Sequence, residues 1–168
     1  MRLLGLDPGL RITGWGVLDQ HDNRLVWVAD GTVTSDEKLS LAERLAQLNR
    51  GVAEVIARFS PDEAAVEEVF VNINPTSTLK LGQARGAVLT AAGLAGVPVA
   101  EYATRLIKKS LVGTGRGDKQ QVAMMVRQLL PACEIATEDA SDALAAAICH
   151  AHHRGHAGLL LKLAGVLR

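Results

Sequence analysis

Leu3-Leu4-Gly5-Leu6-Asp7-Pro8-Gly9, at the start of the 168-residue chain, is a short apolar run that ends in a carboxylate and a turn. Its apolar residues lack helical spacing, which is typical of a strand buried on both faces of a sheet. The residue before a proline favours extended backbone, so Asp7 is predicted to end the strand and Pro8-Gly9 to form the turn. An acid in this place either bonds to the turn or belongs to a functional site.

The composition indicates one domain with a core of Ala, Leu and Val. Hydrophobic residues make up 48% of the chain but aromatic residues only 3%. No apolar run approaches the roughly 20 residues of a membrane-spanning helix, and the first residues lack a signal-peptide pattern. We therefore expect a cytoplasmic protein without a membrane partner.

The order of the predicted elements indicates a mixed α/β fold. Strands are expected at residues 3–7, 14–18, 25–33, 64–70 and 97–102, and helices at 40–59, 75–94, 104–111, 118–131 and from about 139 onward. Three strands thus come first, and helices alternate with strands afterwards. This order predicts a five-stranded sheet, flanked by helices, in which an antiparallel meander continues into parallel strands.

Four carboxylates from three of these elements are expected to converge. If the first and fourth strands lie side by side, Asp7 neighbours an acid of the pair Glu67 and Glu68, which cannot both face the same way. Asp139 and Asp142 are three residues apart and so share one helix face. Taken alone, this last pair has another explanation, because acids in the first turn of a helix cap it and complement its dipole.

Clustered carboxylates favour a metal-dependent reaction. Their mutual repulsion raises pKa values until divalent cations enter, and hard oxygen ligands select Mg²⁺ or Mn²⁺ over zinc. Two such ions can activate a water and stabilise the leaving oxygen of a phosphodiester. Histidines 150, 152, 153 and 156 are an alternative metal cluster, but at the end of a helix they are more often solvated side chains.

The net charge is zero, yet the charges are segregated along the chain. Residues 101–130 hold six Lys or Arg and two Asp or Glu side chains, which leaves a local charge of +4. Residues 134–142 hold four acids and no base. This pattern is what a phosphate-binding surface beside a metal site requires, although an ordinary solvated face remains the alternative for the lysines.

The predicted helix at 75–94 carries many small residues. Leu79, Gly82, Gly86, Leu89 and Gly93 fall near one side of it, where another element could approach closely. That element is either the sheet or a second subunit, and the sequence alone favours the sheet.

Four strings of sequence resemble the RuvC family of Holliday-junction endonucleases, in register from residue 1 to about 153. They are Asp7-Pro8-Gly9 followed by Arg11 and Thr13-Gly14, Ala65-Val66-Glu67-Glu68-Val69-Phe70, Leu79-Lys80-Leu81-Gly82-Gln83-Ala84-Arg85-Gly86, and Asp139-Ala140-Ser141-Asp142-Ala143-Leu144-Ala145. The resemblance implies a ribonuclease H-like nuclease domain at 1–155 and a C-terminal tail at 156–168. It also implies a homodimer that incises four-way DNA junctions symmetrically in recombination and repair, with a branch-migration motor of the RuvA and RuvB type as partner.

The same resemblance assigns roles to residues. Asp7, Glu67, Asp139 and Asp142 become the catalytic and metal-binding acids, with two Mg²⁺ per site and Mn²⁺ as a substitute; some members carry a histidine at the position of Asp139. The DNA-binding residues become Phe70, Lys80, Arg85, Lys108 and Lys119. Phe70 is expected to act on a base near the crossover, although a phenylalanine after a strand is more often a core residue.

Three rival functions remain at this stage. A ribonuclease H-like enzyme could act on RNA instead, and a non-catalytic junction-binding module would share the fold without needing all four acids. The segment from Asp7 to Gly14 also faintly resembles the phosphate loop of actin-like and sugar-kinase ATPases. Those ATPases need a duplicated fold, which is too large for one compact domain of this length.

Overall fold

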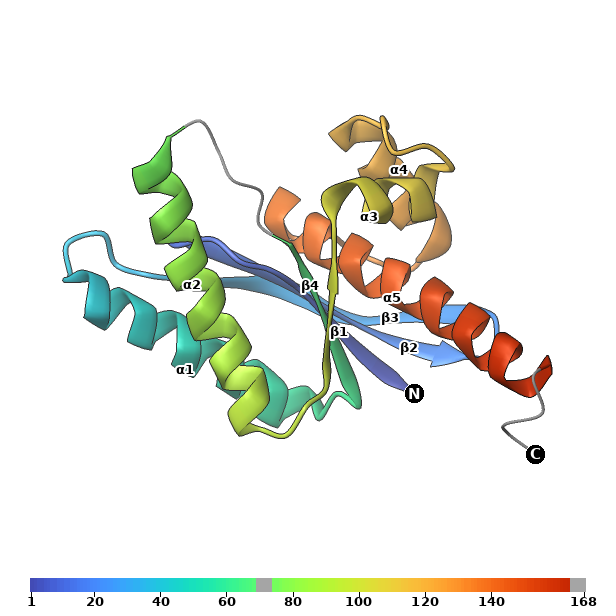
Figure 1. The fold of residues 1–168 in the computed structure, drawn as a ribbon, viewed down its shortest axis with the longest axis horizontal. Coiled ribbons are helices and arrows are strands. Elements are labelled where there is room, and N and C mark those ends of the chain that lie inside the picture. Colours follow the sequence, from blue (N-terminus) through green and yellow to red (C-terminus); the bar gives the residue numbers. More distant parts are fainter. Residues whose placement is uncertain (69–73, 164–168) are drawn as a thin grey trace.

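The computed structural model describes residues 1–68 and 74–163, with side chains up to residue 154. This part of the chain forms five strands and five helices, whose arrangement is drawn in Figure 1. The strands are β1 (Arg2–Asp7), β2 (Ile12–His21), β3 (Arg24–Thr34), β4 (Glu63–Glu67) and β5 (Val99–Tyr102). The helices are α1 (Leu41–Phe59), α2 (Pro75–Leu94), α3 (Thr104–Val112), α4 (Lys119–Leu129) and α5 (Glu138–Leu163).

The strands form one mixed sheet in the order β3-β2-β1-β4-β5. β1, β2 and β3 are antiparallel neighbours, whereas β1 pairs with β4, and β4 with β5, in parallel. The predicted meander followed by parallel strands is therefore confirmed. Several boundaries differ by a few residues: β2 is longer than predicted at both ends and β5 is shorter. The fourth strand ends at Glu67, and Phe70, to which the prediction extended it, lies outside the described residues.

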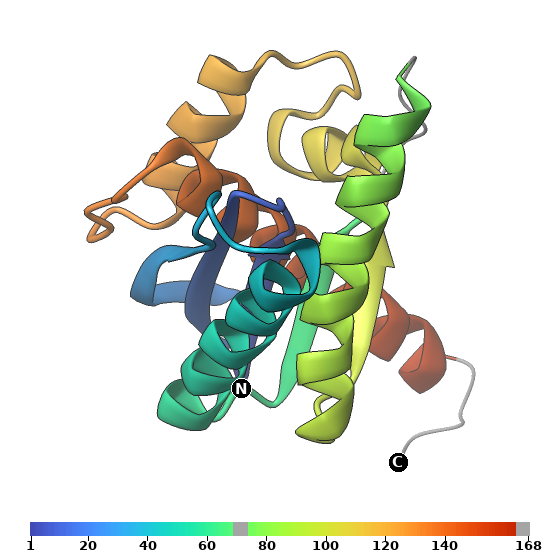
Figure 2. The same cartoon turned by 90° about the vertical axis from the view of Figure 1, so that its left-hand side faces the viewer.

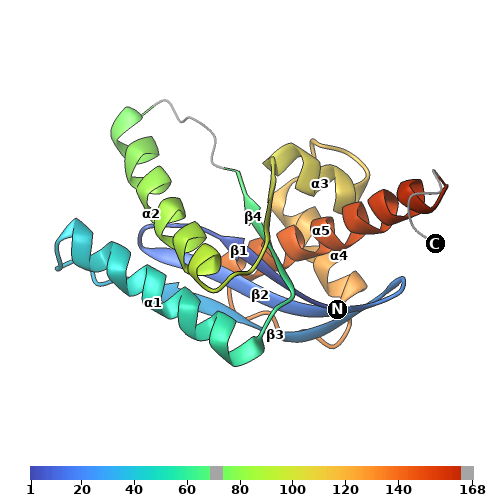
Figure 3. The same ribbon diagram turned by 60° about the horizontal axis from the view of Figure 1, so that its bottom comes forward.

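Helices cover both faces of the sheet. Figures 1 and 3 show α1 and α2 on one face and α5 on the other, with α3 and α4 against α5. Neighbouring strand residues point to opposite faces, so Leu3 packs in the cluster of α5 while Leu4 packs in the cluster of α1 and α2. Leu3, Leu4 and Leu6 are all fully buried, as predicted for a strand covered on both faces.

Local signals fix the ends of several elements. The Ser40 hydroxyl accepts from the Glu43 amide, and the Glu43 carboxylate accepts from the Ser40 amide, which completes the capping box of α1. Asp118 and Gln121 form the same box at α4. Asp22, between β2 and β3, has φ = 53°, a conformation that Asp tolerates in a tight turn.

Glycines in β1 and β2 let α5 lie directly on the sheet. A Cβ atom on Gly5 would overlap the carbonyl oxygen of Ala143, and one on Gly14 would overlap that of Asp139. Because any larger residue would push the helix outwards, these two glycines set the distance between α5 and the strands. That distance determines where the acids of α5 lie relative to Asp7.

The glycines of α2 do not face the sheet, so the prediction that they do is wrong. Among the described residues, no atom lies within 4 Å of a Cβ atom placed on Gly82, Gly86 or Gly93. Figure 2 shows α2 alongside α1, and α2 reaches the core through Ala84, Val88, Ala91 and Ala92 instead. The side rich in small residues is therefore open.

Within the described ranges, no helix combines the length and the apolar character that crossing a membrane requires.

Candidate active site

The sheet brings Asp7 and Glu67 together. In the parallel β1–β4 pair, Leu6 lies opposite Val66, so Asp7 and Glu67 are the next residues along the two strands. Gly5 and Ala65, two residues earlier on each strand, face α5. Because strand side chains alternate, both acids also face α5 at the carboxyl ends of their strands.

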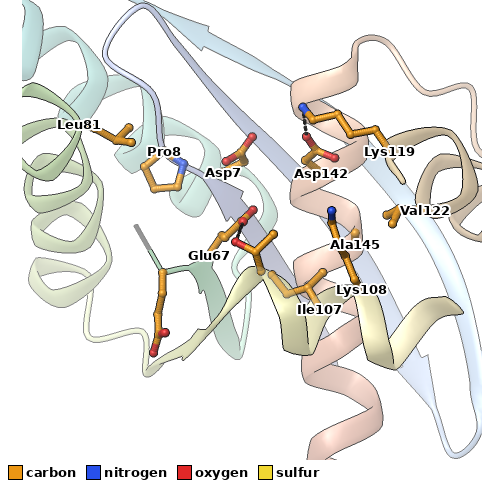
Figure 4. A pocket seen from close by; sticks show the side chains of 12 residues that line it. Asp7, Pro8, Glu67, Leu81, Ile107, Lys108, Lys119, Val122, Asp142 and Ala145 are labelled. Atoms are coloured by element: carbon orange, nitrogen blue, oxygen red, sulfur yellow. Dashed lines mark hydrogen bonds and ion pairs between the residues drawn. The ribbon is translucent and has the colours of Figure 1, made fainter. Parts of the chain in front are cut away.

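Helix α5, which the two strand acids face, adds Asp142 to them. Figure 4 shows Asp7, Glu67 and Asp142 pointing into one pocket of about 320 Å³. The residues lining the pocket come from β1, β4, α2, α3, α4 and α5, together with Pro8 and Glu68. Asp139 does not line the pocket, but it is close enough for its charge to raise the pKa of Asp7. The predicted convergence of acids from three elements is therefore present, with Asp139 at its margin.

The acids disturb one another electrostatically. Burial raises the pKa of Asp7, and the negative charges of Glu67, Asp142 and Asp139 raise it further, to about 7. Burial also raises the pKa of Glu67, an effect opposed by a hydrogen bond that the Thr104 hydroxyl donates to its carboxylate. Such repulsion between buried carboxylates favours the entry of cations.

Two of the predicted lysines lie at this pocket. Lys119, the first residue of α4, donates from Nζ to Oδ2 of Asp142 at 3.2 Å, and this carboxylate raises the pKa of Lys119. Lys108 lines the pocket from α3, and its charge lowers the pKa of Glu67. The ammonium groups of Lys108 and Lys119 are therefore both near the acids.

The other predicted DNA-binding residues lie elsewhere or outside the described chain. Lys80 is exposed on α2 and does not line the pocket. Arg85 forms an ion pair with Glu101 of β5 and does not line the pocket either. Phe70 falls within residues 69–73, outside the described residues. The structure thus brings Lys108 and Lys119 to the acids but not Lys80 or Arg85.

Comparison with known proteins gives a family. A family model described as crossover junction endodeoxyribonuclease RuvC matches residues 3–150. The chain is 66% identical over 155 residues to the protein of that name from Paramagnetospirillum magneticum, covering 92% of this chain and 93% of the relative. It is 62% identical over 166 residues to that of Rhodospirillum rubrum, covering 98% of both. The chain belongs to the RuvC family.

Solved structures agree with this assignment. T. thermophilus RuvC in complex with Holliday junction substrate superposes with a TM-score of 0.87 at 35% identity, covering 94% of this chain and 96% of the other. The yeast mitochondrial Holliday junction resolvase matches with a TM-score of 0.64 at 11% identity, over 96% of this chain and 85% of the other. At that identity the likeness concerns the fold alone.

The acids of this RuvC family member fit a hard divalent cation. Four carboxylates near one another, one with a pKa of about 7, supply oxygen ligands and a charge that needs compensation. Within the described residues, no group of three or more His, Cys, Asp or Glu side chains lies close enough together to hold a metal ion by itself. A hard divalent cation can be held in such a site by one or two carboxylates, with water and substrate phosphate oxygens as its other ligands.

The histidines of α5 are not solvated as a group, so the prediction of solvated side chains is wrong for His150. Its side chain is 5% exposed. One ring nitrogen lies 2.8 Å from the Tyr102 hydroxyl and the other 2.8 Å from a Glu63 carboxylate oxygen. His150 therefore belongs to a partly buried hydrogen-bond network at the start of β4, at the opposite end of that strand from Glu67.

Sequence reasoning missed two kinds of residue at the site. Thr104 carries no periodic or motif signal, because its role depends on the pairing of β5 with β4. Gly5 and Gly14 were noticed as parts of strands, but their contact with α5 depends on the packing of that helix. A glycine inside a strand is the signal that could have indicated such close approach.

Proposed function

We propose that this chain is a divalent-metal-dependent endodeoxyribonuclease that resolves four-way DNA junctions by hydrolysing phosphodiesters at paired sites, in recombination and repair. The observation that carries the proposal is the convergence of Asp7, Glu67 and Asp142 in one pocket. Membership of the RuvC family, whose members are named for junction cleavage, gives the substrate. The cytoplasm, where chromosomal DNA is accessible, is then the place of action.

The acids have the central role in this proposal. Asp7, Glu67 and Asp142, with Asp139 as the fourth and outermost acid, would hold two Mg²⁺, with Mn²⁺ as a substitute. Bound there, the ions supply an activated water and stabilise the leaving oxygen of the phosphodiester. The carboxylates orient the ions between strand and helix. The raised pKa of Asp7 means that this residue is in part protonated near neutral pH until cations neutralise the repulsion from its neighbours.

The basic residues would hold the DNA strand. Lys108 and Lys119 line the pocket, so each can attract the phosphate that is to be cut. Lys119 would exchange its carboxylate partner for this phosphate once cations have neutralised Asp142. Lys80 and Arg85 on α2 would contact the backbone further away, and Phe70 would act on a base at the crossover.

A homodimer would supply two sites for two symmetric cuts. A four-way junction has two-fold symmetry, and a C2 dimer presents two equivalent sites to it. The open side of α2 supports this proposal, because Leu79 is 64% exposed there and Gly82 and Gly86 have free space above them. A motor of the RuvA and RuvB type would deliver the junction, and residues 156–168 would form a tail beyond the 1–155 domain.

The deciding experiment compares substrates with and without metal. Purified protein is incubated with a labelled four-way junction, the matched linear duplex and a structured RNA, in Mg²⁺ or in EDTA, with Asp142→Asn as the matched inactive variant. We expect paired nicks in the junction only, in Mg²⁺ only, and none from the variant. Cleavage of RNA with an intact junction would mean a ribonuclease, and binding without cleavage in Mg²⁺ would mean a non-catalytic module.

A further inference from the structure

Thr104 lies where the ladder between two parallel strands fixes its distance from Glu67. β4 and β5 pair with Glu67 opposite Tyr102, and the Glu68 amide donates to the Tyr102 carbonyl at 2.9 Å. Thr104 follows Tyr102 after one residue and is the first residue of α3. Its backbone is thus anchored on one side by the sheet and on the other by a helix.

The hydroxyl of Thr104 bonds to the acid and not to its own helix. Oγ1 donates to Oε1 of Glu67, the contact marked by the dashed line beside Glu67 in Figure 4. Threonine near a helix start commonly caps it, yet α3 begins after Ala103 without any side-chain cap. The Thr104 hydroxyl therefore bonds to a carboxylate in the pocket instead of capping the helix, which is the ordinary use of a threonine at a helix start.

The bond constrains a side chain that would otherwise rotate. Glu67 has three side-chain torsions, and a flexible ligand loses conformational entropy when it binds a cation. Holding Oε1 fixes the carboxylate plane, and no hydrogen bond to Oε2 is found among residues 1–68 and 74–154. Thr104 also lines the pocket together with Ile107 and Lys108, one turn later on α3, so the same helix places both the hydroxyl and a cation.

We propose that Thr104 is a positioning residue that orients the Glu67 carboxylate for binding a divalent cation. This inference rests on the proposed function, since it assumes that Glu67 is a metal ligand. Partners that orient the ligands of a metal typically contribute 10- to 100-fold to metal affinity or activity. A hydroxyl that served only the fold would not affect metal affinity.

The test measures metal affinity directly as well as cleavage. Thr104→Val keeps the shape but removes the donor, and Thr104→Ser restores the donor. The control is Thr90→Val, because the Thr90 hydroxyl donates to the Gly86 carbonyl on α2, away from the pocket. Mn²⁺ affinity is measured by electron paramagnetic resonance without DNA, and junction cleavage is measured across a range of Mg²⁺ concentrations. Thermal melting confirms that each variant is folded, and Thr104→Ala replaces the valine variant if that one does not fold.

We expect Thr104→Val to bind Mn²⁺ roughly tenfold more weakly and to need roughly tenfold more Mg²⁺ for half-maximal cleavage. At saturating Mg²⁺ its rate should stay within about threefold of the wild type, and Thr104→Ser and Thr90→Val should match the wild type. Wild-type Mn²⁺ affinity in Thr104→Val would overturn the inference, as would a lower saturated rate with an unchanged metal requirement. A wild-type protein that binds Mn²⁺ but does not cut junctions would instead overturn the proposed function.

Discussion

At the scale of single residues, the site is held in an unfavourable electrostatic state. The pKa of Asp7 is about 7, because the residue is buried and three other acids add their repulsion. Lys119 relieves part of this strain through its contact with Asp142. The metal-free protein therefore gives up some stability to keep its acids together, a cost that cations offset when they bind.

Replacing Asp7 by Asn should abolish cleavage and stabilise the metal-free protein at alkaline pH. The folded pKa of about 7 lies above the ordinary value of 3.8, so the folded state binds more protons than the unfolded state between these pH values. Stability from this group is present in acid and is lost as the pH rises through 7, by at most about 4 kcal/mol. We expect Asp7→Asn to melt several degrees higher than the wild type at pH 8 in EDTA, and the gap to shrink at pH 5.

The melting curves carry their own control. Adding Mg²⁺ should stabilise the wild type at pH 8 more than it stabilises Asp7→Asn, because only the wild type has the full charge to neutralise. Equal melting temperatures of the two proteins at pH 8 and pH 5 would contradict the raised pKa. Retained cleavage by Asp7→Asn at saturating Mg²⁺ would remove Asp7 from the active site.

Lys119→Ala should weaken junction binding and slow incision. If Lys119 attracts a phosphate, its loss reduces the slope of log affinity against log salt by about one. Lys38→Ala is the matched control, since Lys38 lies in the segment between β3 and α1 and does not line the pocket. Binding titrations across a range of salt concentrations give the slopes. Identical slopes for the two variants would leave Lys119 as an ordinary surface residue.

At the scale of secondary structure, helix α5 brings the acids of the helix to the acids of the strands. Asp142 reaches the pocket only because α5 lies directly against β1 and β2 at Gly5 and Gly14. The geometry of the site is thus set by residues that carry no chemistry. One methyl group added to a strand glycine beneath α5 should therefore displace the carboxylates of the active site.

Gly14→Ala should therefore damage the active site without replacing any acidic side chain. Its Cβ would overlap the carbonyl oxygen of Asp139, so α5 must shift, at a cost of about 1 to 3 kcal/mol. A displacement of about 1 Å can reduce a rate roughly a hundredfold. The control is Gly93→Ala on α2, where the new methyl meets no atom within 4 Å in the part of the chain that the structure describes. Single-turnover cleavage and thermal melting measure the two effects, and normal cleavage by Gly14→Ala would show that α5 does not set the geometry.

The sequence predicts elements well where the signal is local. The alternation and spacing of apolar residues predicted the five strands and the helices, and capping residues such as Ser40 and Asp118 marked where two helices start. An acid of the pair Glu67 and Glu68 was predictable as a neighbour of Asp7, because parallel strands bring their carboxyl ends to one edge, and the family resemblance singled out Glu67. The bond of Thr104 and the outward side of α2 were not, since each depends on how distant elements pack.

At the scale of the whole molecule, a dimer would account for two features together: the segregated charges and the open side of α2. The chain has no net charge, yet its cations and acids are segregated, and Lys108 and Lys119 line the same pocket as Asp7, Glu67 and Asp142. A uniformly basic surface would bind any DNA. A neutral molecule with a local basic region gains affinity when two such regions engage one substrate at once.

The wild-type protein should therefore be a dimer in solution, with Leu79, Gly82 and Gly86 of α2 in the interface. Glycines on a helix let a second helix approach closely, and an exposed leucine beside them supplies apolar area. Gly82→Arg fills this space with a charged side chain, and because the position is open in the monomer, it should leave folding intact. Sedimentation equilibrium should show a dimer for the wild type and a monomer for the variant. On a junction, the variant should make single, unpaired nicks at a rate reduced at least tenfold, because binding through two sites typically adds two or more orders of magnitude to affinity.

Lys38→Ala again serves as a control that should remain dimeric. A wild-type protein that sediments as a monomer both alone and on junction DNA would refute the dimer, whereas a Gly82→Arg protein that remains dimeric would move the interface to another surface.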